Sequence, residues 1–127
     1  MKLYLAIGIG GMLGASSRYG ISLLLDTNDG FPFSTLLVNL IGCFVLAYLL
    51  NHTIIKQRLS PHIFTALTTG VIGSFTTFSA LAVEFVQLLG SHVVAAISYL
   101  LITFVGGLVF SYLGYQVSTK DGKQVAR

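Results

Sequence analysis

The stretch Gly70-Val71-Ile72-Gly73-Ser74-Phe75-Thr76-Thr77-Phe78-Ser79 places glycines, hydroxyls and aromatic rings inside the third of four long apolar segments. That segment runs from residue 62 to residue 89, which is 28 residues and about 42 Å as one straight α-helix, against a hydrocarbon core of about 30 Å. Two shorter helices that meet within the membrane fit better. In hydrocarbon, the backbone groups released by such a break need protein groups, trapped water or an ion as partners. The stretch therefore predicts a broken membrane helix and a candidate ion site.

The composition of the chain is that of an integral membrane protein. Apolar residues make up 54% of its 127 residues, charged residues 9%, and the mean hydropathy is +0.86, whereas soluble domains carry about 25% charged residues. We expect an all-α fold with one membrane domain, residues 1–117, and a short polar tail, residues 118–127, that is disordered. The expected spans cover about residues 3–25, 33–51, 62–89 and 93–115.

The placement of charge predicts how the chain is oriented in the membrane. If the four spans alternate in direction, the basic residues outside them lie on one side: Lys2, Lys56, Arg58, Lys120, Lys123 and Arg127. The opposite side has a predicted loop with Asp26 and Asp29, and no Lys or Arg. Because positively charged loops stay on the cytoplasmic side, both termini are expected there.

Polar side chains inside apolar segments usually face protein or water, so each one is a candidate member of a pathway. Asn39 and Thr35 lie one helical turn apart in the second segment, and an amide at that depth either offers N–H donors or bonds a neighbouring helix. Arg18 is expected to line a pathway or to extend toward the membrane surface. Glu84 is the only carboxylate within the apolar segments, where it can line a vestibule, couple to protons or pair with Arg18.

Further candidates lie in the break and in the fourth segment. Tyr99 and Thr103 are four residues apart, so their hydroxyls share one stripe of a helix that suits an anion. The alternative is that these hydroxyls have no functional role, because Thr hydroxyls often donate to carbonyls of their own helix. In the break, the partly positive ring edge of Phe78 can face an anion, and Ser79 adds a hydroxyl. An aromatic stripe is otherwise most often part of a packed core.

The chain carries three motifs, which are Gly10-Gly11-Met12-Leu13-Gly14-Ala15-Ser16-Ser17-Arg18-Tyr19, then Thr35-Leu36 with Val38-Asn39 and Gly42, then Gly70 to Gly73 with Phe75-Thr76-Thr77-Phe78-Ser79. In this order, and over nearly the whole chain, they closely resemble the Fluc/CrcB family of small fluoride channels. The resemblance implies an antiparallel dimer in the bacterial plasma membrane. It also implies two narrow fluoride pores and a central structural sodium ion held by backbone carbonyls at the two helix breaks.

The resemblance assigns roles to individual residues. Asn39 is similar to the family's pore-lining amide, and Phe78 to the first of its paired pore phenylalanines. Gly73 and Thr76 resemble the positions whose backbone oxygens hold sodium. The remaining candidates for the fluoride pathway are Arg18, Thr35, Ser79, Glu84, Tyr99 and Thr103.

Two positions depart from the family pattern. Ala80-Leu81 replaces the usual Thr-Phe, which removes the second pore phenylalanine, and Gly107 stands where a further hydroxyl is expected. An antiparallel homodimer also needs chains in both orientations, which a strong bias of basic residues to one side opposes. We therefore hypothesise a heterodimer with a homologous chain of opposite topology, which would supply the missing ring.

The expected function is passive, fluoride-selective export that confers fluoride resistance, not catalysis. Fluoride only accepts hydrogen bonds, so a pore must replace its water with donors and ring edges. A potential of 100 mV, negative inside, drives each anion outward by about 2.3 kcal/mol. The alternatives are a Fluc-like partner subunit with degenerate pores, a purely structural subunit, and a small four-helix multidrug exporter. The exporter is disfavoured because no span before residue 62 contains a carboxylate.

Overall fold

The computed structural model describes residues 1–25 and 30–125, and all of the regular structure in these residues is helical. The elements are α1 (Lys2–Leu25), α2 (Phe33–Asn51), α3 (Thr53–Arg58), α4 (Pro61–Thr65), the π-helical segment η1 (Ala66–Ile72), α5 (Gly73–Phe75), α6 (Phe78–Ser91) and α7 (Val93–Val125). The expected all-α fold is confirmed. The predicted loop with Asp26 and Asp29 lies outside the described residues.

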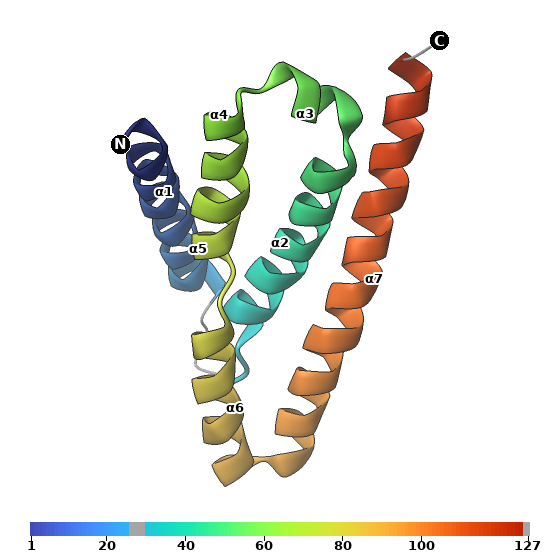
Figure 1. Cartoon of the computed structure of the whole chain (residues 1–127). Helices are drawn as coiled ribbons and strands as arrows, with labels where there is room; N and C mark the ends of the chain where they lie inside the picture. The colour runs from blue at the N-terminus through green and yellow to red at the C-terminus, as the bar shows by residue number, and fades with distance from the viewer. Residues whose placement is uncertain (26–29, 126–127) are drawn as a thin grey trace.

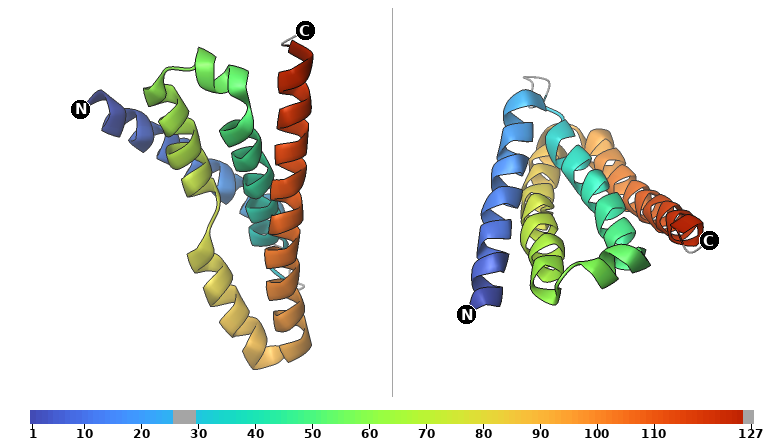
Figure 2. Two further views of the ribbon diagram at one scale, coloured as in Figure 1. Left: turned by 45° about the vertical axis from the view of Figure 1, so that its right-hand side comes forward. Right: turned by 90° about the horizontal axis from the view of Figure 1, so that it is seen from above.

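The third apolar segment is broken, as its sequence predicts. We call α4, η1 and α5 together the first arm, and α6 the second arm. Between the arms the backbone is extended at Thr76 (φ −77°, ψ 156°) and at Thr77 (φ −149°, ψ 128°), and helix resumes at Phe78. Figure 1 shows this extended link between α5 and α6. Across the molecule the order is α1, the first arm, α2 and α7, as Figure 1 and the right-hand view of Figure 2 show.

Glycines let α1 lie directly on the first arm. A Cβ at Gly14 would collide with the carbonyl oxygen of Val71, and a Cβ at Gly10 would lie 2.5 Å from the carbonyl oxygen of Ala66. From the other side, a Cβ at Gly70 would lie 2.6 Å from the carbonyl oxygen of Ile7. Small residues that permit such backbone contact are the usual means by which membrane helices pack. The first arm is thereby fixed against α1 up to the break.

The polar C-terminal residues continue α7, so the expectation of a disordered tail from residue 118 is wrong as far as Val125. A Cβ at Gly114 would collide with the carbonyl oxygen of Phe44, and Ser118, one turn later, is 1% exposed. The Tyr48 hydroxyl donates to Asp121 Oδ2 at 3.2 Å. The end of α7 is helical because it has a surface of α2 to pack on.

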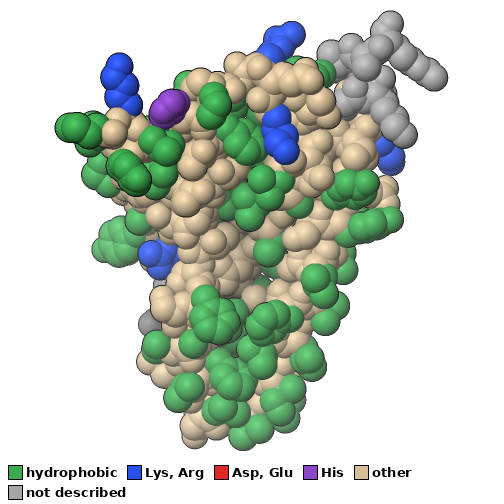
Figure 3. All heavy atoms as spheres, viewed as in Figure 1, with side chains coloured by type: hydrophobic (Ala, Val, Ile, Leu, Met, Phe, Trp, Pro, Cys, Tyr) green, Lys and Arg blue, Asp and Glu red, His purple; other side chains and the backbone are tan. Residues whose placement is uncertain are grey.

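The surface of the molecule is suited to lipid. Among the described residues, three helical stretches are long and apolar enough to cross a membrane: Phe33–Asn51, Pro61–Ser91 and Val93–Asp121. The helix α1 is less apolar, since it contains Arg18 together with several glycines and serines. In Figure 3 most of the visible Lys and Arg side chains lie at the end of the molecule that carries both termini, and hydrophobic side chains cover much of the rest. The chain is a membrane protein.

Candidate functional site

The amide of Asn39 is bound to the backbone of the break. Asn39 Nδ2 donates to the carbonyl oxygen of Thr77 at 2.9 Å, and the Thr77 N–H donates to Asn39 Oδ1 at 2.8 Å. The second bond fixes the orientation of the amide, because only its oxygen can accept from a backbone N–H. The interhelical alternative weighed for this residue is therefore present. Since an amide nitrogen carries two hydrogens, one N–H of Asn39 is still available to a ligand.

The side chain of Thr77 begins the second arm. Its Oγ1 accepts from the Ala80 N–H at 3.2 Å, which caps α6, and it lies 3.3 Å from Ser79 Oγ. Thr76 instead turns its hydroxyl back to the carbonyl oxygen of Ile72, at 3.0 Å. The extended link is thus held at both of its residues, and the predicted site residues Thr76, Ser79 and Asn39 are brought together around it.

Glu84 lies in a cluster that joins three helices. Thr35 of α2 donates to Glu84 Oε1 at 2.7 Å, and the Tyr99 hydroxyl of α7 donates to Glu84 Oε2 at 2.7 Å. Tyr99 is fully buried and packs against Leu81, Leu88 and other residues of the small apolar core between α6 and α7. Each carboxylate oxygen therefore accepts one hydroxyl hydrogen bond, and the two donors come from different helices. The sequence indicates each of these residues as a candidate, but it does not indicate that they bind one another.

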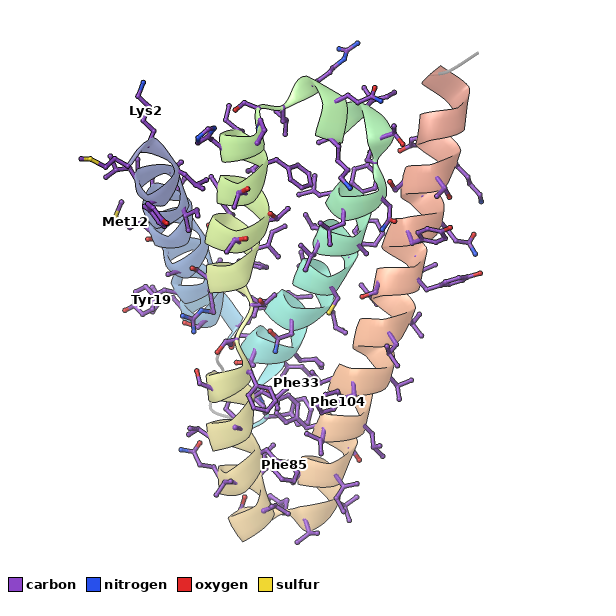
Figure 4. The ribbon with its side chains drawn as sticks, viewed as in Figure 1. Lys2, Met12, Tyr19, Phe33, Phe85 and Phe104 are labelled. Carbon is purple, nitrogen blue, oxygen red and sulfur yellow. The ribbon has the colours of Figure 1, made fainter. Side chains whose placement is uncertain are left out.

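Arg18 and Glu84 face the same small cavity without forming an ion pair. The cavity has a volume of about 210 Å³ and is lined by Ala15, Arg18, Tyr19, Ser22, Ser34, Thr35, Ala80 and Glu84. The Arg18 Nε atom is buried and has no hydrogen-bond partner within the described part of the chain. A guanidinium with an unpartnered, buried N–H beside several hydroxyls makes this cavity attractive to an anion or to water. Figure 4 shows the neighbouring Met12 and Tyr19 on the outer side of α1.

The hydroxyl stripe on α7 is not a row of unbonded donors. Thr103 Oγ1 donates to the carbonyl oxygen of Tyr99 at 2.7 Å, which is the backbone bond weighed as the alternative, and the Tyr99 hydroxyl is bound to Glu84. Gly107, which continues the stripe, is buried, and a Cβ there would contact Cys43 Sγ at 3.4 Å. The polar side chains at the break are therefore those of Asn39, Thr76, Thr77 and Ser79, and the Thr76 hydroxyl already donates to Ile72.

A broad depression of about 460 Å³ lies beside the break, between α2 and α7. It is lined by Asn39, Gly42, Cys43, Leu46, Thr76, Thr77, Phe78, Leu81, Thr103, Phe104, Gly107, Leu108 and Ser111. Phe78 is 73% exposed at its edge, whereas Leu81, in the position of the missing phenylalanine, is 4% exposed and belongs to the core. The exposed Phe78 ring therefore lies at the rim of an apolar depression.

The backbone oxygens of Gly73 and Thr76 are the predicted cation ligands. Gly73 is the first residue of the three-residue helix α5 and Thr76 is its C-cap, so both carbonyl groups lie where the first arm ends and have no further turn of helix to bind. Such hard oxygens suit a monovalent cation without requiring a carboxylate. Within residues 1–25 and 30–125, no group of three His, Cys, Asp or Glu side chains could hold a metal.

Comparison with known proteins relates the whole arrangement to one family. The fluoride-specific ion channel FluC 1 of Desulfitobacterium hafniense is 46% identical over 113 residues, which cover 88% of this chain and 99% of that protein. FluC 2 of Listeria innocua is 46% identical over 118 residues, covering 92% of this chain and 91% of that protein. FluC 1 of Bacillus cereus is 46% identical over 116 residues, covering 89% and 81%. Residues 5–115 match the family described as CrcB-like protein, Camphor Resistance (CrcB), and the chain belongs to this family.

Proposed function

We propose that this chain is a fluoride-specific ion channel. The observation that carries the proposal is its 46% identity, over nearly its whole length, to proteins named as fluoride-specific ion channels. The site is consistent with that activity, because an amide, hydroxyls and an exposed ring edge meet at a helix break inside apolar segments. A channel carries out no covalent chemistry, so the chain is not an enzyme. The same relationship removes the support for a multidrug exporter.

The proposed fluoride path runs past Asn39 and Phe78. The remaining N–H of Asn39 and the Ser79 hydroxyl supply donors, and the edge of the Phe78 ring supplies a partly positive surface. Thr103 lines the same depression and reaches the anion when its hydroxyl rotates away from the Tyr99 carbonyl.

The pore mouth is proposed to lie at Arg18 and at the cluster of Thr35, Glu84 and Tyr99. The positive guanidinium draws anions toward the cavity that it shares with Glu84. The Thr35 and Tyr99 hydroxyls occupy the two Glu84 carboxylate oxygens, which keep their negative charge beside the Arg18 guanidinium.

The proposed assembly is an antiparallel dimer of four-span chains. In this arrangement α1 crosses the membrane beside the first arm, and a second chain covers the depression at Phe78. The backbone oxygens of Gly73 and Thr76 from both chains hold a structural sodium ion between them. When bound, the ion supplies a fixed positive charge that joins the two breaks.

The proposed location is the bacterial plasma membrane, with both termini in the cytoplasm. Figure 1 shows both termini at one end of the molecule, and the basic side chains of Lys2, Lys56, Arg58 and Lys120 are exposed. Because nearly all copies should insert in this one orientation, we propose a heterodimer with a homologous chain of opposite topology. The buried Leu81 supports it, since a partner would supply the second ring.

Fluoride efflux from liposomes tests the function. Purified copies in detergent are free to assemble in opposite orientations, so vesicles that contain only this protein should release fluoride and retain chloride, whereas empty vesicles should retain both. No fluoride release from a folded preparation, with release restored by a co-expressed homologous chain, would identify a partner subunit with degenerate pores.

A reporter on the C-terminal tail tests topology. Equal labelling from both sides of the membrane, with fluoride resistance from this gene alone, would exclude the heterodimer.

A further inference from the structure

The hydrogen bonds of the break determine which backbone carbonyls lose their helical partners. In a continuous α-helix the Thr77 N–H would bind the carbonyl oxygen of Gly73, four residues earlier. Here that N–H binds Asn39 Oδ1 instead, at 2.8 Å. The Gly73 carbonyl is thereby released by a side chain of another helix, and not only by the local sequence.

The second carbonyl is released by a side chain within the break itself. A continuous helix would direct the Ala80 N–H to the carbonyl oxygen of Thr76. The Ala80 N–H instead binds Thr77 Oγ1 at 3.2 Å, and Thr77 has the extended backbone of a helix cap. The two displaced donors therefore correspond one to one with the two carbonyls that are candidate cation ligands.

We propose that Asn39 is a positioning residue for the cation site, in addition to its place on the fluoride path. Its Oδ1 holds the Thr77 N–H away from Gly73, and Thr77 Oγ1 holds the Ala80 N–H away from Thr76, so that both carbonyl oxygens stay open to an ion. Without Asn39 Oδ1, α5 can extend by one residue and use the Gly73 carbonyl internally. This inference rests on the proposed sodium site, and it makes that site dependent on a residue that does not touch the ion.

The test is the sodium dependence of thermal unfolding of the purified protein in detergent, with N-methyl-D-glucamine replacing sodium at constant ionic strength. Asn39→Leu removes the acceptor at similar size, and Asn39→Asp keeps an oxygen for the Thr77 N–H. Asn51→Leu is the matched control, because Asn51 lies on the same helix and bonds only its own turn, at the carbonyl of Ala47. The measured quantity is the sodium concentration that gives half of the maximal sodium-dependent increase in the unfolding temperature.

We expect Asn39→Leu to raise this concentration about tenfold or more, since a lost orienting hydrogen bond corresponds to about one such factor. Asn39→Asp keeps the acceptor for the Thr77 N–H but loses the donor to the Thr77 carbonyl, so its value should lie between those of the wild type and Asn39→Leu while fluoride flux is lost. Asn51→Leu should not change the concentration. A wild-type concentration in folded Asn39→Leu would overturn the inference alone. Absence of any sodium response in the wild type would overturn the proposed sodium site and the inference with it.

A second pair of variants decides the question if Asn39→Leu does not fold. Thr77→Val removes the cap at constant shape and should raise the same sodium concentration about tenfold, whereas Thr77→Ser keeps the hydroxyl and should resemble wild type. Equal sodium concentrations for Thr77→Val and Thr77→Ser would overturn the role of the cap. The unfolding temperature measured without sodium shows whether a variant is less stable in general or has lost only its affinity for sodium.

Discussion

Gly14→Ala tests whether α1 lies directly against the first arm. The added Cβ would collide with the Val71 carbonyl oxygen, and it would lie 2.9 Å from the carbonyl carbon of Val71 and 3.0 Å from the Phe75 nitrogen. All of these atoms are backbone, so one helix must move, and overpacking of this kind costs about 1–3 kcal/mol. Alanine gains about 0.8–1 kcal/mol over glycine in a helix interior. With overpacking near its upper limit, the net loss is about 2 kcal/mol.

Gly8→Ala is the matched control on the same helix, because nothing lies within 4 Å of a Cβ at that position. It should gain up to about 1 kcal/mol, so the two variants should differ by about 3 kcal/mol. The measurement is the free energy of unfolding from a denaturant titration in mixed micelles, followed by circular dichroism. Equal stabilities of the two variants, or a Gly14→Ala protein more stable than wild type, would refute the close packing.

Three further changes probe the site and the C-terminal helix. Asn39→Asp should reduce fluoride efflux from liposomes by about tenfold or more, because an acceptor replaces the donor that the anion needs; wild-type flux in a folded variant would remove Asn39 from the path. Tyr99→Phe removes a donor to Glu84 and should lower the free energy of unfolding by about 1–2 kcal/mol; a change below about 0.3 kcal/mol would contradict a bond of that strength. Tyr48→Phe releases Asp121 and should speed amide hydrogen exchange in the last turns of α7 alone, and unchanged exchange there would count against the contact.

The helices and the break follow from local features of the sequence. Apolar segments separated by turn residues define α2 and α7, and α2 covers the expected range, 33–51. The break could be predicted because glycines and adjacent threonines in an overlong apolar segment oppose one continuous helix. Each of these signals lies within a few residues of its effect.

The contacts that define the site lie between residues far apart in the chain. Asn39 binds Thr77, 38 residues later, and Thr35 binds Glu84, 49 residues later. A residue type shows that an amide or carboxylate needs partners, but it does not identify them. The sequence does not predict the helical end of α7 for a related reason. Its polar residues indicate a tail without structure, whereas the helix there is stabilised by contacts with α2, at the buried Ser118 and between Tyr48 and Asp121.

The π-helical segment η1 has a consequence for the evolution of the chain. A π-helical turn contains one more residue than an α-helical turn, so η1 is equivalent to a single-residue insertion in the arm. Deleting one residue of η1 would restore α-helical geometry, and the residues that follow would keep nearly their present direction, because the π-helical turn had absorbed the extra residue. Gly70 would still meet α1, and Thr77 would still face Asn39. A change of one codon can therefore alter the length of this arm without separating the part that packs on α1 from the break.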